Sequence, residues 1–277
     1  MALKKVETGA EMSAGYRAER ETLLLKVEAV LREDERVEAA WLFGSLGRGT
    51  ADDLSDIDLF VVVADEHLPA VIEQKAAFAA SPDVPLLTLE APQNAPPGGA
   101  YTAALYDGIY GPHAIDWYWQ ARSIAQIPTE TRLLFNRAGL SRLDTPTRFD
   151  YQPVPEQTPE EAVSQAVNAC WYGILIAGKY VARSPFEEHM GLLGWVNGSR
   201  GHIQNFLGLA AVTDADTPHP TPQEKSAVLR RLCAEMEALM PQVEAKGGRV
   251  CYEVAPSIYR YLDMIEAIFT CQPASYS

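Results

Sequence analysis

The sequence predicts an α+β protein, with a mixed β-sheet in an N-terminal domain and an α-helical bundle in a C-terminal domain. Three observations support this: strand-like apolar runs in the first half, a proline-rich connector at residues 145–157, and marked helix starts beyond it. Strands mixed with few helices are typical of an α/β or α+β domain, and the helical second half makes the whole chain α+β. We therefore expect domains at residues 1–150 and 158–277.

The first half combines helical and strand-like segments. Residues 10–35 predict a helix because apolar side chains recur at helical spacing, and residues 68–80 predict another. The predicted strands are residues 39–43, 58–64, 85–90, 101–106, 114–120 and 132–136. The run 93–99 is rich in proline and glycine and predicts a loop.

Beyond the connector, a hydroxyl residue, a proline and a glutamate recur in the same order three times. These patterns are Thr158-Pro159-Glu160-Glu161, Ser184-Pro185-Phe186-Glu187 and Thr221-Pro222-Gln223-Glu224. Each has the form of a capping box with proline in the first turn, so each predicts the start of a helix. With a fourth helix expected at residues 257–269, the second half predicts a helical bundle.

The composition favours a cytoplasmic protein and disfavours a nucleic-acid partner. The chain has 277 residues, of which 47% are hydrophobic, and a formal net charge of −14. An acidic surface repels nucleic-acid phosphates and attracts polycations, although solubility alone also explains negative charge. No apolar run of about 18 residues predicts a membrane span, and the polar N-terminus lacks a secretory stretch. Four scattered cysteines fit reduced thiols.

The most informative motif joins a Gly-Ser turn to two aspartates. Gly44 and Ser45 follow the first predicted strand, and a polar connector then leads to Asp56 and Asp58 at the start of the second. Residues two apart in a strand point to the same side, so the two carboxylates project together, roughly 6–7 Å apart. Such a pair suits Mg²⁺, which takes oxygen ligands and keeps other positions for phosphates and water.

This pattern resembles the nucleotidyltransferase superfamily that includes DNA polymerase beta, and within it the aminoglycoside and lincosamide nucleotidyltransferases. The resemblance covers residues 41–63 and includes the Ser-Asp-Ile-Asp-Leu wording at residues 55–59. It implies transfer of a nucleoside monophosphate, AMP from ATP, to a hydroxyl group of a small molecule. Mg²⁺ would be the cofactor, and pyrophosphate would be released.

The resemblance also implies a role for each motif residue. Asp56 and Asp58 would be catalytic and would hold the metal ion. Gly44 and Ser45 would meet the triphosphate, through the serine hydroxyl and through the turn amides, which form an anion-binding nest. Arg48 would assist the phosphates; the alternative is that it faces solvent.

A third carboxylate completes the site in the superfamily, where it binds metal or takes a proton from the acceptor hydroxyl. Asp116 is the first candidate, because it lies in a strand-like apolar run and shares one face of that strand with Tyr118. Neighbouring negative charge or a bound metal would suit Asp116 to act as a base. Glu90, at the end of the strand 85–90, is the competing candidate.

The helix that starts at Thr158 carries two further candidates. Its Trp171-Tyr172 and Gly178-Lys179 pairs resemble the corresponding helix of aminoglycoside nucleotidyltransferases, whose lysine meets ATP phosphate. The resemblance implies that Lys179 binds phosphate and that Tyr172 lines the nucleotide cleft. A solvated lysine near the helix end and a tyrosine used only for packing are the alternatives.

The expected acceptor is an aminoglycoside-like antibiotic, so the expected biological effect is antibiotic resistance; a lincosamide or another metabolite stays open. One alternative is a nucleotidyltransferase that modifies a protein or RNA partner in the manner of antitoxins, although such proteins resemble the catalytic domain alone. The other is a non-catalytic nucleotide-binding module, which would not require three carboxylates. The sequence does not indicate an oligomeric state.

Overall fold

The computed structural model describes residues 7–146, 153–185, 187, 190, 192–211 and 221–270. The chain divides into two compact units. The sheet unit comprises Arg17–Tyr106 and His113–Glu156, and the helical unit comprises the described residues of Met1–Tyr16, Asp107–Pro112 and Gln157–Ser277. The division at Gln157 lies in the proline-rich connector. In addition, the helical unit takes the start of the first helix and the short segment between two strands.

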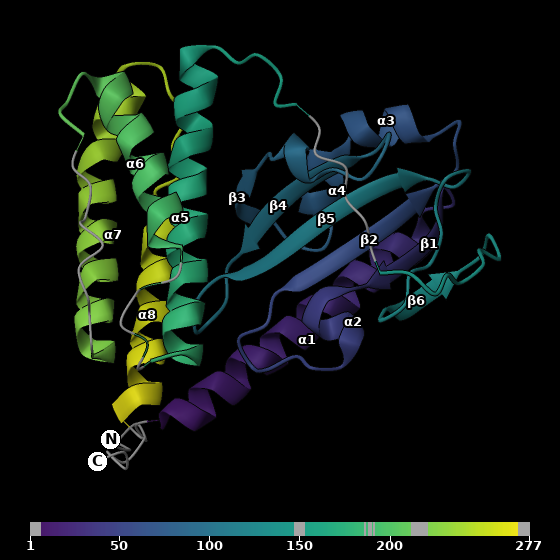
Figure 1. The fold of residues 1–277 in the computed structure, drawn as a ribbon, viewed down its shortest axis with the longest axis horizontal. Coiled ribbons are helices and arrows are strands. Elements are labelled where there is room, and N and C mark those ends of the chain that lie inside the picture. The colour runs from purple at the N-terminus through teal and green to yellow at the C-terminus, as the bar shows by residue number, and fades with distance from the viewer. Residues whose placement is uncertain are drawn as a thin grey trace, which may run out of the picture. The chain divides into compact units, whose positions relative to one another are not determined.

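Six strands form one mixed sheet in the order β3-β4-β5-β2-β1-β6 (Figure 1). Their bounds are Val37–Leu42 (β1), Ile57–Val63 (β2), Pro85–Leu89 (β3), Ala100–Tyr106 (β4), His113–Ala121 (β5) and Arg132–Asn136 (β6). Strands β2 and β5 are parallel, and the other neighbours are antiparallel. The predicted α+β class is confirmed, and every predicted strand is present with small shifts at its ends.

The two faces of the sheet differ because side chains alternate along each strand. One face forms the core with α1 (Gly9–Glu33), α3 (Leu68–Glu73) and α4 (Lys75–Ala80). Leu59 and Trp117 belong to this core, together with Val27 from α1 and Phe78 from α4. The alternate residues of β2 and β5 therefore point to the opposite face.

Three expected features of this unit take a different local form. The helix predicted over residues 68–80 is interrupted at Gln74, which ends α3 and precedes α4. The Gly-Ser turn is the start of a short helix, α2 (Gly44–Arg48), which Gly49 closes with a φ of 72°. In the predicted loop 93–99, a single 3-10 turn, η1, covers Pro92–Asn94.

The helical unit is built from α5 (Pro159–Arg183), α6 (Leu193–Leu207), α7 (Pro222–Ala245) and α8 (Val254–Thr270). Helix α5 packs against the other three, and for this reason it is buried over most of its circumference and not along one stripe. Among the described residues, no helix has an apolar stretch sufficient to cross a bilayer.

Two of the three predicted helix starts are confirmed. Thr158 and Thr221 each close a capping box, in which the threonine side chain accepts from the backbone N–H of the glutamate three residues on. The prediction at Ser184 is wrong. Helix α5 continues to Arg183, the Ser184 N–H bonds to the Tyr180 carbonyl, and Ser184 therefore ends a helix. The next helix begins at Leu193, and Phe186 of the motif lies outside the described residues.

Candidate functional site

Asp58 and Asp116 lie side by side on the sheet face opposite to α1, α3 and α4. They are direct partners in the register of the parallel strands β2 and β5. Neighbouring strands are separated by roughly 4.8 Å, so the two carboxylates start from adjacent backbone positions. Asp56 immediately precedes β2, and alternation directs its side chain to the side of Asp58. All three aspartates are half-buried.

Tyr118 lies on the same face of the sheet as these carboxylates. It is the next residue of β5 on the same face as Asp116, and it is buried. Burial raises the pKa of the Tyr118 hydroxyl strongly, and the charges of Asp116, Asp58 and Asp56 raise it further, in that order. The charges of all three aspartates therefore act on this hydroxyl in addition to its burial.

A second tyrosine holds Asp116. Tyr101 of β4 is the register partner of Tyr118, and their rings meet edge to face at 4.9 Å between centroids. Burial first, and then the charge of Asp116, keep the pKa of Tyr101 well above its usual value, and side-chain hydrogen bonds link it to Asp116 and Asn94. A protonated phenol donates to a carboxylate, so Tyr101 restrains the rotation of the Asp116 side chain.

The turn at Gly44 receives the carboxylate of Asp58. An ideal Cβ built on Gly44 would lie 1.9 Å from Oδ2 of Asp58, a distance that no real side chain tolerates. The Phe43 N–H donates to the Asp58 carbonyl over 3.1 Å, which fixes the turn against β2. Ser45 follows in α2 and is half-buried, and Arg48 at the end of α2 is exposed.

The connector before Asp56 is held by a buried arginine. Arg20 of α1 is 3% exposed, and its guanidinium donates to the carbonyls of Asp52 (2.8 Å) and Ser55 (3.0 Å). Within the connector, the Ser55 hydroxyl donates to Oδ1 of Asp52 over 2.8 Å. The backbone directly before Asp56 is therefore fixed from two sides.

Glu90, the competing third carboxylate, faces the other way. The Thr102 hydroxyl donates to Glu90 over 2.9 Å, and Thr102 is the register partner of the core residue Trp117. Glu90 also pairs with Lys75 of α4 at 2.9 Å. It therefore lies on the face covered by helices, and it is Asp116 that the sheet places beside Asp58.

Tyr172 and Lys179 lie in α5 of the helical unit. Both are buried, Lys179 with 6% exposure, so Lys179 is not the solvated lysine of the alternative interpretation. The Lys179 ammonium lies 5.9 Å from the ring centroid of Tyr180, and Tyr172 packs edge to face against Trp195 at 6.0 Å. The expected role of both residues in nucleotide binding stays a prediction.

The donor chemistry of the three aspartates fits Mg²⁺. Within the described ranges, no group of three or more His, Cys, Asp or Glu side chains is arranged so that it could hold a metal ion. Mg²⁺ usually needs only one or two protein carboxylates, because water and substrate phosphates supply its other ligands. Asp58 and Asp116, with Asp56 alongside, offer this partial set.

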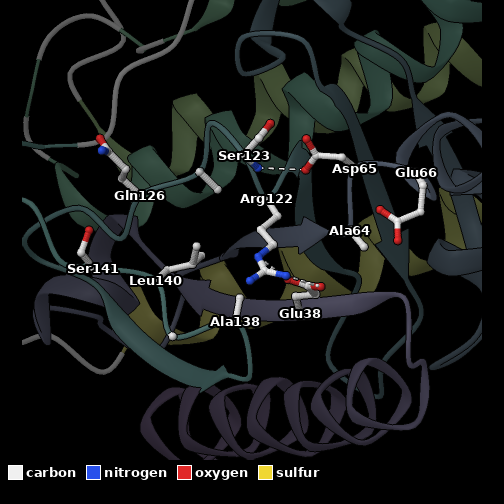
Figure 2. Close-up of a pocket in the computed structure, with 12 residues that line it drawn as sticks. Glu38, Ala64, Asp65, Glu66, Arg122, Ser123, Gln126, Ala138, Leu140 and Ser141 are labelled. Carbon is white, nitrogen blue, oxygen red and sulfur yellow. Dashed lines mark hydrogen bonds and ion pairs between the residues drawn. The ribbon is translucent and has the colours of Figure 1, made fainter.

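A polar cavity of about 600 Å³ lies at the other ends of β2 and β5 (Figure 2). Inside it, Arg122 pairs with Glu38 at 3.0 Å, and the Ser123 N–H donates to Asp65 over 2.9 Å. The cavity follows the C-terminal ends of the two strands, roughly 20 Å from the aspartates at about 3.3 Å per residue. It is separate from the candidate site.

The sequence does not single out Arg20 or Tyr101, although both hold parts of the site. Arg20 precedes Leu24 by four residues and Val27 by seven, which puts it on the buried stripe of α1. A buried arginine needs polar partners, so this spacing is a usable signal. Tyr101 offers no such signal, because its place depends on the register of β4 and β5.

A match to a family model agrees with the motif. The family model described as "Polymerase beta, Nucleotidyltransferase" matches residues 25–90, from within α1 to the residue after β3. This match confirms the resemblance to the nucleotidyltransferase superfamily; it includes both motif aspartates, and Asp116 lies beyond it. A search of curated proteins finds no match. Among solved structures, a STING-associated CdnE c-di-GMP synthase from Capnocytophaga granulosa is similar, with 15% identity, a TM-score of 0.28, and coverage of 94% of this chain and 81% of that chain.

Proposed function

We propose, from the nucleotidyltransferase domain that residues 25–90 carry, that this chain transfers AMP from ATP to a hydroxyl group of a small molecule. The observation that carries this proposal is the direct pairing of Asp58 with Asp116 across two parallel strands. A carboxylate pair on rigid neighbouring strands, next to a Gly-Ser turn, suits the charge neutralisation that nucleotidyl transfer needs.

In the proposed reaction, the acceptor hydroxyl oxygen bonds to the α-phosphorus of ATP. The bond between that phosphorus and the oxygen bridging to the β-phosphate breaks, and pyrophosphate leaves. Asp116, held by Tyr101, takes the proton from the acceptor hydroxyl and passes it to solvent. When bound, Mg²⁺ neutralises phosphate charge and orients the attacking and leaving oxygens.

The other motif residues bind and position. Asp56 and Asp58 supply carboxylate oxygens to the metal, and the Gly44 turn holds the Asp58 carboxylate in place. Ser45 offers its hydroxyl to the triphosphate, and Arg48 offers a positive charge at the exposed end of α2. Binding energy used in this way accelerates the reaction because it is strongest when negative charge develops on the transferring group.

A polycationic, aminoglycoside-like molecule is the first acceptor to test. The net charge of −14 would attract several amino groups at once and would raise the local concentration of such an acceptor. Antibiotic resistance would follow from modification of a drug hydroxyl. A lincosamide and uncharged metabolites belong in the same panel. The negative net charge attracts cations in general, but it does not determine which hydroxyl group is modified.

The test measures pyrophosphate release from ATP, with Mg²⁺ and without it, over a panel of hydroxylated acceptors that includes aminoglycosides and lincosamides. Mass spectrometry should find an acceptor that has gained one AMP. Asp56→Asn should lower the rate by several orders of magnitude, since it removes a ligand that acts mainly in the transition state. Unchanged turnover in that variant would refute the role of Asp56. Label found on protein or RNA would support the antitoxin-like alternative.

The roles of Tyr172 and Lys179 need their own test, with the affinity for ATP as the measured quantity. Lys179→Met should weaken ATP binding about tenfold, because a hydrogen bond between charged groups contributes roughly 1.5–3 kcal/mol. Lys225→Met is the matched control. Lys225 is also a buried lysine of the helical unit, and its ammonium donates to the backbone carbonyls of Ser184 and Pro185. Equal ATP affinity in the two variants would remove Lys179 from the proposal.

A further inference from the structure

The side chain of Tyr101 reaches Asp116 diagonally across two strands and forms a hydrogen bond with it. Asp116 is the register partner of Ala103, and Tyr101 precedes Ala103 by two residues, so all three side chains point to the same face of the sheet. Diagonal neighbours on antiparallel strands are separated by roughly 7–8 Å, a distance that aromatic side chains can bridge. Ala103 is small and buried, so it leaves room for the Tyr101 ring beside Asp116.

Asn94 forms a second hydrogen bond with the Tyr101 hydroxyl. It is the last residue of the single turn η1, in which the Asn94 N–H donates to the carbonyl of Ala91 over 2.8 Å. Turn η1 follows the edge strand β3 and packs against β4, the strand that carries Tyr101. Tyr101, which is 4% exposed, is thus hydrogen-bonded to an amide as well as to a carboxylate.

The two hydrogen bonds act on the Tyr101 hydroxyl in opposite directions. Burial is the largest influence on the pKa of Tyr101 and raises it; the hydrogen bond with Asp116 also raises this pKa, whereas the one with Asn94 lowers it. A donor to the phenol oxygen favours the ionised form, and an acceptor of the phenol hydrogen favours the protonated form. The Asn94 amide N–H therefore donates to the Tyr101 oxygen, and the single phenol hydrogen is directed to Asp116. Donation to the oxygen also polarises the O–H bond and strengthens its donation to the carboxylate.

The segment that carries Asn94 is itself tied to the sheet. Ala95 is buried with 3% exposure, and the Gln120 amide donates to the carbonyl of Pro97 over 3.3 Å. Gln120 lies on β5, two residues after Tyr118 and on the same face. Because the segment is fixed on both sides of Tyr101, the Asn94 amide is held in place and can orient its partner. Side chains that are fixed in this way keep a functional group within its productive geometry.

We propose that Asn94 is a positioning residue of the AMP transfer: acting through Tyr101, it holds the Asp116 carboxylate in the orientation that accepts the proton of the acceptor hydroxyl. The inference rests on the proposed function, because it takes Asp116 as the base. The role requires no contact of Asn94 with the substrates or the metal ion. Asn94, Tyr101 and Asp116 all lie beyond residues 25–90, so the match to the family model does not assign this role.

The experiment compares variants of the whole protein by kcat and by the KM for ATP. Asn94→Leu has nearly the same size but cannot donate, and it should lower kcat roughly three- to tenfold. Asn94→Asp has the same shape but offers an acceptor, so it competes with Asp116 for the phenol hydrogen and should lower kcat further. The KM for ATP should stay unchanged in both variants, because the base acts on the acceptor hydroxyl and not on ATP.

The same change is then made in Tyr101→Phe, which keeps the ring and removes the hydroxyl. Because Asn94 acts through this hydroxyl, Asn94→Leu should have no further effect on kcat in that background. Asn136→Leu is the matched control: Asn136 is also a half-buried asparagine of the sheet unit, and its side chain bonds to the backbone carbonyl and N–H of Leu140 at 3.0 and 2.9 Å. This control should lower the melting temperature and leave kcat unchanged. An equal loss of kcat in the control would assign the effect to destabilisation and overturn the inference.

The outcomes separate the inference from the proposed function. Unchanged kcat in both Asn94 variants, or an equal effect of Asn94→Leu with and without the Tyr101 hydroxyl, overturns the inference while transfer by the parent protein keeps the proposed function. If the parent protein modifies no acceptor in the panel, the free energy of unfolding replaces kcat as the measured quantity. Asn94→Leu and Asp116→Asn should then be non-additive, and this coupling should vanish in Tyr101→Phe. Such coupling supports the orientation of Asp116 by Asn94, and additive effects overturn it.

Discussion

The carboxylate of Asp58 occupies the space into which any side chain at position 44 would project. An ideal Cβ on Gly44 would stand 1.9 Å from Oδ2 and 2.9 Å from Cγ of Asp58. The glycine also has a φ of 61°, which L-residues rarely adopt. The glycine of the Gly-Ser motif is therefore required twice, by backbone conformation and by the nearby carboxylate.

Gly44→Ala should lower the rate of AMP transfer on the order of 100-fold, because misplacement of a catalytic group by about 1 Å has an effect of that size. The measurement is kcat with ATP and the best acceptor. Gly49→Ala is the matched control, since Gly49 has a similar φ of 72° but nothing within 4 Å of its ideal Cβ. Both variants carry the backbone strain, and only the first displaces Asp58. Equal losses of activity would assign the effect to strain alone.

The choice between the two third-carboxylate candidates predicts opposite outcomes for two isosteric changes. Asp116→Asn removes the proposed base beside Asp58 and should lower kcat by roughly 10²–10⁴-fold. Glu90→Gln changes a carboxylate on the face covered by helices and should leave kcat within a few-fold of the parent, with some loss of stability from the pair with Lys75. A large effect of Glu90→Gln with a small effect of Asp116→Asn would reverse the assignment.

Arg20 should act on activity through the connector that it holds. Arg20→Met removes the donors to the carbonyls of Asp52 and Ser55, each worth roughly 1.5–3 kcal/mol for a charged group, and loosens the backbone before Asp56. We expect a higher Mg²⁺ concentration for half-maximal rate as well as a lower melting temperature. Rescue of the rate by added Mg²⁺ distinguishes this positioning role from simple destabilisation.

The control for Arg20 is Arg17→Met. Arg17 also lies on α1 and pairs with Asp53 of the same connector at 2.9 Å, but it is exposed. An exposed pair contributes only about 0–1 kcal/mol, so this variant should keep the Mg²⁺ dependence of the parent. The same Mg²⁺ shift in both variants would show that any contact with the connector matters, and that burial of Arg20 does not.

Local patterns predicted most of the fold because they depend on neighbours in sequence. The capping boxes at Thr158 and Thr221 are such patterns, and both helices start where expected. The pattern at Ser184 has the same form but does not start a helix. Helix α5 continues up to Ser184, whose N–H donates to the Tyr180 carbonyl at the C-terminal end of that helix. A local motif cannot reveal where the preceding helix ends when tertiary packing extends it.

The candidate site likewise combines features that local sequence patterns predict with features that they do not. The strand that begins after Asp56, and the alternation that pairs Asp116 with Tyr118 on one face, follow from sequence. The adjacency of Asp58 and Asp116 is implied only by the family resemblance, because it requires β5 to lie parallel beside β2 in one particular register. The burial of Lys179 also escapes the sequence, since α5 is surrounded by three other helices. Contacts between segments far apart in the sequence determine these features, and no short sequence pattern predicts such contacts.

The two tyrosines around Asp116 predict an alkaline loss of stability. Burial and the aspartate charges raise the pKa of Tyr101 and of Tyr118 above the ordinary value of 10.0. Above pH 10 the unfolded chain releases both phenol protons while the folded protein keeps them, so the folded state binds more protons. The free energy of unfolding must then fall as the pH rises, by up to about 1.4 kcal/mol per pH unit for each tyrosine.

Denaturant unfolding between pH 9 and pH 11 measures this slope. Tyr118→Phe removes one of the two groups, so the free energy of unfolding should fall less steeply as the pH rises. Tyr180→Phe changes an exposed tyrosine and serves as the control. A slope that is identical in the parent and in Tyr118→Phe would mean that this hydroxyl ionises alike in both states. Neither burial nor the aspartate charges would then raise the pKa of Tyr118 in the folded protein.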